Sequence, residues 1–399
     1  MSAKDLIALT EQYSAHNYAP LEVVVHSGRG VWVTDVEGHR YMDLLSAYSA
    51  LNFGHSNPRI LQAAHKQLDT LTLTSRAFFS DTAALAGRAL ATLCHKDKVL
   101  FMNSGAEAVE TSIKAARKWG YDIKGIPEDE AEIIVFSNNF HGRTTTIVSF
   151  STSAESRRGF GPFAKGFRLV PYGDADAVEA ALTPQTAAVI VEPILGEGGV
   201  IIPPTGFLRR IRELCTAHNV LMIADEIQTG LCRTGKLFAC EHEDVVPDMY
   251  ILAKSLGGGI VPVSAIVANN DVMQVFTPGT HGSTFGGNPF ACAIVCEVVA
   301  IINEERPHER AVELGAYALE RLRAIPSPFV REIRGRGLLI GIDIDPAAGT
   351  AKDFCKKLKY EGVLCKDTRQ QTIRIAPPLV ITREELDIAL ESFAKVLRG

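Results

Sequence analysis

Six short apolar runs, separated by helical patterns, constrain the fold of this chain more than any other feature. They occupy residues 98–102, 132–137, 187–192, 220–224, 249–252 and 264–268. The runs are rich in valine and isoleucine and are bounded by glycine, proline or asparagine, which is typical of strands buried on both faces. Helical patterns, such as residues 106–119 and 207–218, lie between them. This alternation predicts an α/β fold with a doubly wound, mainly parallel central sheet and helices on both faces.

The two ends of the chain follow other patterns. Residues 23–43 predict a short antiparallel ribbon, and residues 288–303 predict a long apolar helix. Two further strand candidates and a last helix follow, at residues 337–344, at 372–375 and from about 382. We therefore expect three parts, since the C-terminal third mixes helices and strands without the central alternation. These are an N-terminal segment that packs with the small domain (1–45), a large domain (46–289) and a smaller α+β C-terminal domain (290–399).

Composition argues against several classes of function. The formal net charge of -5, without a basic stretch, argues against a nucleic-acid partner. No apolar run reaches the roughly 18 residues that a membrane span needs. Residues 1–13 are polar and of mixed charge, unlike a signal or transit peptide. We therefore expect a cytoplasmic protein that does not enter the membrane.

Cysteine and histidine spacing predicts neither disulfides nor a metal centre. The eight cysteines form no CxxC pair, and Cys292 and Cys296 lie one helical turn apart in an apolar stretch. Such usage is typical of free, reduced thiols in the cytosol. The eleven histidines show no HExxH spacing, so we expect no metal site.

The first candidate site pairs Asp225 with Lys254. Each follows an apolar run, and ligands of open parallel sheets bind beyond the carboxyl ends of the strands. An aldehyde cofactor needs a lysine for covalent attachment and a carboxylate at its pyridine nitrogen. Apolar surroundings lower the pKa of a lysine and favour the free amine. Taken alone, the pair also fits a simpler interpretation, in which Asp225 caps a turn and Lys254 is a solvated loop residue.

A second candidate is the sequence NSGAEAVE from residue 103, which joins a predicted strand to a helix. Gly105 allows a ligand close to the backbone, and the helix N-terminus offers free N–H groups to a phosphate. Ser104 and Glu107 have the spacing of a capping box. The two interpretations are compatible.

A third candidate is FHGR, residues 140–143, after another predicted strand. Phe140 can stack on a planar ring, and Arg143 can bind a carboxylate through two hydrogen bonds. A plain turn with a packed phenylalanine explains this motif equally well.

One motif points to a different class of protein. Residues 230–236, GLCRTGK, match a phosphate-binding P-loop except at the next position, which is Leu237 instead of serine or threonine. The magnesium ligand is therefore missing. A P-loop nucleotide-binding protein remains the rival from another class, although a very weak one.

Six motifs together resemble the class III, or ornithine-type, aminotransferases of fold type I, and the resemblance covers nearly the whole chain. The motifs are NSGAEAVE, FHGR, EPILGEGG, ADEIQTGLCRTG, LAKSLGGG and HGSTFGGNP. The resemblance implies a pyridoxal 5'-phosphate (PLP) cofactor, with Lys254 attached to it and transferring the proton, and Asp225 at its pyridine nitrogen. It further implies a set of cofactor contacts: Gly105 and Ala106 at the phosphate, Gln228 at the ring hydroxyl, Phe140 on the ring, and Ser283 and Thr284 at the phosphate across a dimer interface. A homodimer with a shared active site is expected.

Within that family, the surroundings of Tyr18 and Tyr48 resemble the enzymes that act on ornithine. The resemblance implies that both tyrosines shape the substrate pocket, and that the terminal amine of ornithine passes to 2-oxoglutarate, giving glutamate 5-semialdehyde and glutamate. His141 departs from this pattern, because many ornithine enzymes carry tryptophan there, whereas histidine is common in acetylornithine relatives. Acetylornithine or 4-aminobutyrate aminotransferase therefore remains the alternative.

The resemblance also implies a switch between the two substrates. Glu197 would pair with Arg374 and mask it while Arg143 holds the distant carboxylate of ornithine. Glu197 would then release Arg374 for the α-carboxylate of glutamate or 2-oxoglutarate. In the alternative interpretation, Glu197 is a static loop residue.

Overall fold

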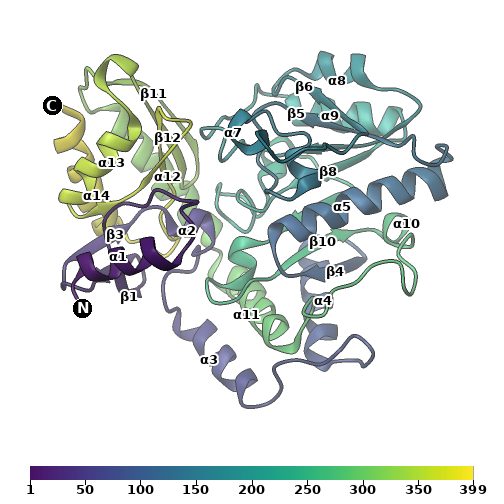
Figure 1. Cartoon of the computed structure of the whole chain (residues 1–399), viewed down its shortest axis with the longest axis horizontal. Coiled ribbons are helices and arrows are strands. Elements are labelled where there is room, and N and C mark those ends of the chain that lie inside the picture. The colour runs from purple at the N-terminus through teal and green to yellow at the C-terminus, as the bar shows by residue number, and fades with distance from the viewer. Residues whose placement is uncertain (399) are drawn as a thin grey trace.

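The computed structural model describes residues 1–398 of the chain. It has two lobes (Figure 1): one is built around a seven-stranded sheet, and the other contains both ends of the chain and two four-stranded sheets. The helices are α1 Ala3–Tyr13, α2 Ser46–Ser49, α3 Pro58–Leu68, α4 Asp81–Leu93, α5 Gly105–Trp119, α6 Thr145–Val148, α7 Ala154–Arg157, α8 Ala175–Ala181, α9 Phe207–Ala217, α10 Asn270–Met273, α11 Pro289–Glu305, α12 Pro307–Arg323, α13 Ala351–Tyr360 and α14 Arg383–Arg398.

The large sheet contains all six apolar runs of the sequence. Its strands, in spatial order, are β4 Lys98–Met102, β10 Ser264–Ala268, β9 Met249–Leu252, β8 Leu221–Asp225, β7 Thr186–Val191, β5 Glu132–Phe136 and β6 Phe167–Val170. From β9 to β6 every pair is parallel, which confirms the mainly parallel α/β fold. The edge strand β6 was not predicted, because its middle residues are exposed and it lacks a continuous apolar run.

Strand β10 departs from the parallel pairing that the alternation predicts. It runs antiparallel to both β9 and β4. The reason lies in the connection from β9, where residues 253–263 contain only a short 3-10 helix, Lys254–Gly257. A parallel crossover needs a dozen or more residues, usually with a helix. The chain therefore returns directly beside β9.

The side chains of the large sheet alternate between two cores. One core contains Ile190 and Ile223 together with apolar residues of α5, and the other contains Val191 and Met222 together with residues of α9 and α11. Strands β7, β8, β9 and β10 are buried along their whole length. Helices therefore cover both faces of the sheet, as the doubly wound pattern predicts.

The second lobe joins the two ends of the chain. Its sheets are β1 Val25–Arg29, β2 Trp32–Asp35, β3 Arg40–Asp43 and β13 Val363–Leu364, and β11 Val330–Arg336, β12 Leu339–Ile344, β15 Thr372–Ile375 and β14 Lys366–Thr368. The predicted N-terminal ribbon is confirmed as β1 to β3, and β3 pairs in parallel with β13. The division at residues 45 and 289 stays a prediction.

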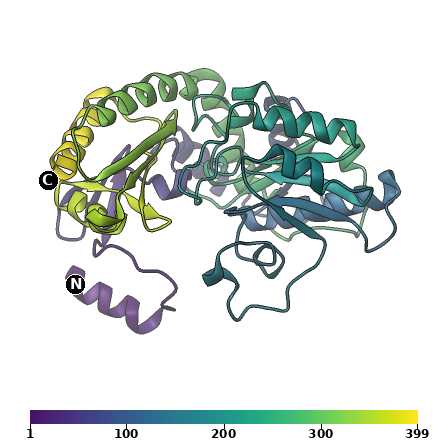
Figure 2. The same ribbon diagram turned by 90° about the horizontal axis from the view of Figure 1, so that it is seen from above.

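Helix α1 buries none of its residues and projects away from the sheets of the second lobe (Figure 2). Within residues 1–398, no helix has the length and apolar character needed to cross a membrane. All eight cysteines are free, and seven of them are buried.

Gly315 of α12 packs closely against Gly337 in the turn between β11 and β12. A Cβ atom on Gly315 would lie 2.2 Å from the carbonyl oxygen of Gly337, and one on Gly337 would lie 2.4 Å from the carbonyl carbon of Thr234. Optimal carbon contacts need about 3.5–4.0 Å. Because the obstructing atoms belong to the backbone, they cannot move aside without shifting a whole element.

We therefore expect Gly315→Ala to lower the free energy of unfolding by about 1–3 kcal/mol, the usual range for overpacking. Gly87→Ala in α4 is the matched control, because a Cβ there meets no atom of the chain within 4 Å. That control should raise stability by about 0.5–1 kcal/mol, as alanine usually does in a helix. Denaturant unfolding measures both. Equal stability of the two variants would contradict close packing at Gly315.

Candidate active site

A cavity of about 230 Å³ lies beyond the carboxyl ends of β8 and β9. Asp225 is the last residue of β8, and Lys254 follows β9 by two residues. The cavity is lined by Gly105, Ala106, Phe140, His141, Gly142, Glu192, Glu197, Asp225, Ile227, Gln228, Thr229, Ala253 and Lys254. Seven of the residues predicted from the sequence are therefore brought together in one cavity.

Lys254 enters the cavity from a strained backbone. Its φ of 48° lies in the left-handed region, which is uncommon for a residue with a side chain and clusters at functional sites. Burial of its amine is the main cause that lowers the pKa of Lys254, the charge of Arg374 lowers it further, and the charge of Glu197 opposes both. A lowered pKa favours the neutral amine, the form that attacks a carbonyl.

Asp225 forms a buried pair with His141. The Asp225 Oδ2 atom lies 2.6 Å from Nδ1 of His141, and the two side chains are 4% and 1% exposed. The other carboxylate oxygen accepts the Ile227 N–H at 3.1 Å. Burial lowers the pKa of His141, but the hydrogen bond and charge of Asp225 and the charge of Glu192 outweigh it, so the pKa is raised. The hydrogen bond to Asp225 therefore favours the protonated form of His141.

Glu192 completes this buried group. Its carboxylate accepts the backbone N–H groups of Phe140 at 2.7 Å and Gly196 at 3.3 Å. Burial raises its pKa to about 7, with His141 acting against the shift and Asp225 adding to it. Near neutral pH the Glu192 carboxyl can therefore hold a proton, which limits the negative charge that gathers around His141.

Gln228 is fixed between two loops. Its Nε2 donates to the backbone carbonyl of Tyr48 at 3.3 Å. A Cβ on Gly196 would lie 1.5 Å from Oε1 of Gln228, so only glycine at position 196 leaves room for this amide. Gly196, the first glycine of EPILGEGG, thus leaves the space that the Gln228 side chain occupies.

The N-terminus of α5 opens onto the same cavity through Gly105 and Ala106. Ser104 accepts the Glu107 N–H while Glu107 accepts the Ser104 N–H, which confirms the predicted capping box. Gly142, with a φ of 132°, approaches this terminus so closely that a Cβ would lie 3.0 Å from Cβ of Ala106. The helix end offers partial positive charge and N–H groups to an anion.

Glu197, which lines the cavity, forms an ion pair with Arg374, which does not itself line it. Nη1 of Arg374 lies 2.5 Å from Oε1 of Glu197, and the arginine side chain is fully buried whereas that of Glu197 is 29% exposed. Among the described residues, Nε and Nη2 of Arg374 have no hydrogen-bond partner. The Tyr48 ring centre lies 5.1 Å from the guanidinium carbon. Burial raises the pKa of Glu197, but Arg374 and Lys254 more than offset this and lower it.

The other predicted residues do not line the cavity within this chain. The guanidinium of Arg143 lies 5.9 Å from the ring centre of Phe140, at the rim. Tyr18 is 63% exposed, on the irregular segment between α1 and β1. Ser283 accepts a hydrogen bond from Nδ2 of Asn103 at 2.9 Å, and Thr284 beside it is exposed.

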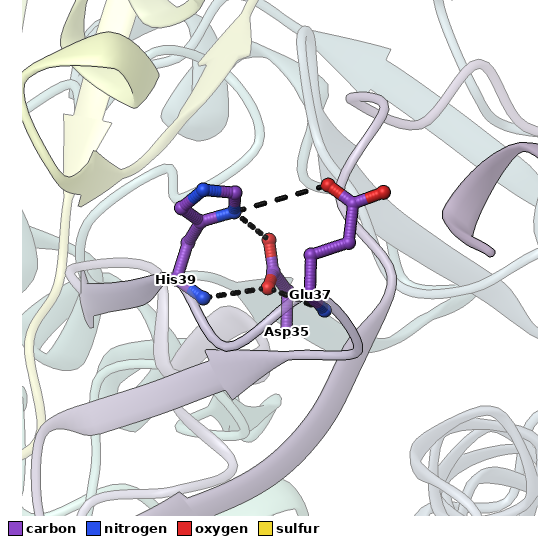
Figure 3. Close-up of side chains that lie close together, drawn as sticks. All are labelled: Asp35, Glu37 and His39. Carbon is purple, nitrogen blue, oxygen red and sulfur yellow. Dashed lines mark hydrogen bonds and ion pairs between the residues drawn. The ribbon is translucent and has the colours of Figure 1, made fainter.

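One cluster of possible metal ligands occurs in the described part of the chain, and it lies far along the second lobe. It comprises Asp35, Glu37 and His39 in the turn between β2 and β3 (Figure 3). The Asp35 carboxylate accepts the backbone N–H groups of Glu37 at 2.9 Å and His39 at 2.8 Å, and the Tyr41 hydroxyl at 3.2 Å. These bonds explain the cluster as a stabilised turn.

Residues 230–236 do not form a phosphate cradle. Three of their backbone N–H groups donate to nearby backbone carbonyls: Gly230 to Glu226, Cys232 to Leu237, and Gly235 to Cys232. The next helical element is a five-residue 3-10 helix, Ala239–Glu243, instead of the long helix that follows a P-loop. The P-loop alternative is therefore wrong on geometry.

Comparison with known proteins identifies the class. The family model Aminotransferase class-III matches residues 13–397. An ornithine aminotransferase of Geobacillus sp. (strain WCH70) is 57% identical over 395 residues, which cover 99% of this chain and 98% of the relative. The ornithine aminotransferase structure from Toxoplasma gondii with partial occupancy of PLP has a TM-score of 0.98 and 47% identity, covering 99% of this chain and 94% of that one. The acetylornithine aminotransferase of Elizabethkingia anophelis has a TM-score of 0.91 and 45% identity, covering 100% and 98%.

A lysine with lowered pKa, a buried carboxylate and a helix N-terminus around one cavity fit an aldehyde cofactor that carries an anionic group. Among enzymes of that kind, the chain belongs to the class III aminotransferases. Its cofactor is PLP. Lys254, Asp225 and the N-terminus of α5 are the groups that would hold it.

Two residues of the site were missed by the sequence analysis. His141 was considered only as a departure from other ornithine enzymes, and Glu192 was quoted within a motif without a role. Both contact the buried centre around Asp225. Their positions in the sequence could have indicated both residues. His141 directly follows Phe140, and Glu192 directly follows β7 at the same edge of the sheet.

We expect His141→Gln to destabilise the cofactor-free protein most at low pH. The raised pKa of His141 means that the folded state binds this proton more tightly than the unfolded state. The stabilisation is fully present below the unfolded pKa near 6.5 and is lost as the pH rises through the raised folded value. Denaturant unfolding of parent and variant across this pH range measures the difference. His65→Gln on the exposed face of α3 is the control, and a pH-independent difference for His141→Gln would refute the charged pair.

Proposed function

We propose that this enzyme transfers the terminal amine of L-ornithine to 2-oxoglutarate, giving glutamate 5-semialdehyde and glutamate. The observation that carries the proposal is the buried Arg374 masked by Glu197 beside Tyr48. Ornithine has no carboxylate beside its reacting terminal carbon, so an open arginine there would favour its α-amine instead. The relatives of 57% identity named ornithine aminotransferase support the same substrate.

When bound, PLP supplies the electron sink that makes amine transfer possible. Lys254 attaches it and then removes and returns the substrate proton, as a general base followed by a general acid. Asp225, which is hydrogen-bonded to His141, would hold the proton on the pyridine nitrogen. Phe140 would stack on the ring, Gln228 would contact the ring hydroxyl, and Gly105 and Ala106 would hold the phosphate.

The two substrates make different demands on Arg374. In the first half-reaction Glu197 masks the guanidinium, and Arg143 at the cavity rim holds the distant carboxylate of ornithine. In the second, the α-carboxylate of 2-oxoglutarate binds Arg374 and Glu197 moves away. The unpartnered Nε and Nη2 atoms support this step, because they form a fork that matches a carboxylate. The glycines on both sides of Glu197 ease its movement.

The family offers an alternative substrate, N-acetylornithine, and an acetylornithine enzyme is among the similar structures. His141 was the sequence feature in its favour. In the structure that side chain bonds Asp225 at the cofactor end of the cavity, so it carries no information about the substrate. The contact of Tyr48 with Arg374 at the other end favours ornithine.

We also propose a cytoplasmic homodimer whose subunits share each active site. A second cavity of about 380 Å³ lies beside Lys254, bordered by Asn103, Ser104 and the loop from Gly259 to Val263. An exposed loop of a partner subunit, carrying Ser283 and Thr284, has the right polarity to fill it. Exposed Phe78, Phe79 and Phe285 supply apolar surface for such an interface. Eight free cysteines are typical of a reducing compartment.

A substrate panel tests the function. The purified enzyme should form glutamate 5-semialdehyde from ornithine and 2-oxoglutarate faster than it uses N-acetylornithine or 4-aminobutyrate. Lys254→Ala is the control, and it should lose more than the factor of about 10²–10⁴ that acid–base catalysis alone supplies. Faster turnover of N-acetylornithine would reject ornithine as the substrate, and substantial turnover by Lys254→Ala would remove Lys254 from its role.

Glu197→Ala should speed the glutamate half-reaction relative to the ornithine half-reaction and weaken the preference for the terminal amine. The reason is that removal of the carboxylate leaves Arg374 permanently open. Single-turnover measurements with each amino donor, followed by cofactor absorbance, separate the two halves. Glu197→Gln, which keeps the size but not the charge, should shift the ratio in the same direction. Equal slowing of both halves would identify Glu197 as a static support.

A further inference from the structure

Arg233 is a fully buried arginine outside the cavity that none of the roles above employs. All its hydrogen-bond partners are neutral: the carbonyls of Leu338 at 3.0 Å and Pro377 at 2.6 Å, Oδ1 of Asn52 at 2.5 Å, and Oγ of Ser46 at 3.5 Å. Burial lowers its pKa to about 9. The charge of Asp43 acts on the guanidinium but does not hydrogen-bond it, and a buried charge with only neutral hydrogen-bond partners is costly.

Three of the four partners of Arg233 belong to the segments that carry Tyr48 and Arg374. Pro377 follows Arg374 by three residues, just after β15. Ser46 and Asn52 flank the turn that carries Tyr48. One guanidinium therefore joins the segment of Tyr48 to the segment of Arg374 by hydrogen bonds whose directions are fixed by its planar shape.

The segment α2, which carries Tyr48, is a strained left-handed turn. Four successive residues, Ser46 to Ser49, have φ values of 46°, 47°, 61° and 72°. Each residue with a side chain costs roughly 1–2 kcal/mol in this left-handed region, so the turn persists only where its surroundings enforce it. Ser46 is held from both sides, since Oγ donates to the Ala376 carbonyl at 2.6 Å and accepts from Arg233 at 3.5 Å.

This strained turn orients Tyr48 in two ways. Its ring lies against Arg374, with 5.1 Å between the ring centre and the guanidinium carbon. Its carbonyl accepts the Gln228 amide at 3.3 Å. A relaxed turn would lose both contacts, because a change from left-handed to ordinary φ values redirects the side chain and the carbonyl together.

We propose that Arg233 is a positioning residue that holds the strained turn against Ala376 and Pro377, and thereby sets the spacing of Tyr48 and Arg374 on which substrate recognition depends. The inference deepens the proposed function and rests on it for the identity of the amino donor. Arg233 touches neither substrate nor cofactor in this arrangement. Its influence should therefore appear in substrate binding and selectivity, while the lysine chemistry stays intact.

Two variants test the proposal. Arg233→Lys keeps the charge but replaces the rigid fork with a single flexible ammonium. Ser46→Ala removes only the hydroxyl between Arg233 and Ala376. Ser392→Ala in α14 is the matched control, because this buried serine also donates to a backbone carbonyl, that of Glu361 at 3.0 Å, away from the cavity. Ser46→Ala keeps the test decisive if Arg233→Lys fails to fold.

Both variants should still bind PLP and should raise the KM for ornithine and for 2-oxoglutarate. A loss of about one or two hydrogen bonds corresponds to a roughly 3- to 30-fold rise, with a smaller change in kcat. Hydrogen–deuterium exchange of the cofactor-free protein should increase in residues 44–52. Ser392→Ala should change none of these quantities.

A lower melting temperature with unchanged KM and unchanged exchange in residues 44–52 would overturn the proposal and leave Arg233 as a purely structural residue. The KM for 2-oxoglutarate distinguishes failure of the positioning role from a wrong amino donor. Every class III alternative considered above uses the part of the pocket that binds this acceptor. If the parent enzyme rejects ornithine but both variants still raise the KM for 2-oxoglutarate, the positioning role stands and the proposed donor fails.

Discussion

The parallel pairing of β8 with β9 is the constraint on which the active site depends. In this ladder Asp225 pairs with Ile251, so the two strands end at one edge of the sheet. Strand β4 runs in the same direction, because antiparallel β10 separates it from β9, and the N-terminus of α5 therefore reaches the same edge. Direction of strands, and not nearness in sequence, brings a lysine, a carboxylate and an anion-binding helix end around one cavity.

Burying so many charges in one cavity requires that each be balanced. Two groups of side chains achieve this. Asp225 and His141 pair at the cofactor end, with Glu192 able to take a proton nearby. Glu197 and Arg374 pair at the substrate end. Under the proposed switch, this separation would leave the first group unchanged when a substrate carboxylate exchanges with Glu197, so cofactor binding and substrate exchange would not disturb one another.

The sequence predicted the parts of this site that depend on strand ends and helix starts. The capping box before α5 follows from local pattern, and the rule for parallel sheets makes Asp225 and Lys254 candidates, but the resemblance to the class III family was needed to choose between their two interpretations. The antiparallel course of β10 did not follow, because it depends on a connection too short for a crossover. The contact of His141 with Asp225 and the fork left open on Arg374 depend on side-chain directions across the chain, which no spacing in the sequence encodes. The left-handed turn at Tyr48 is hidden for the same reason: its residues are serine, alanine and tyrosine, without the glycine that usually marks such a backbone.

The Glu197–Arg374 pair also connects substrate recognition to the chemistry of Lys254. The charges of Glu197 and Arg374 act on the pKa of Lys254 in opposite directions. Withdrawal of Glu197 alone would leave Arg374 unbalanced and lower that pKa further. In the proposed switch, an incoming α-carboxylate on Arg374 would restore a negative charge at nearly the same place, and the amine would meet a similar electrostatic environment in both half-reactions. One arginine with one exchangeable partner would then allow a single lysine to serve two substrates of different shape and charge.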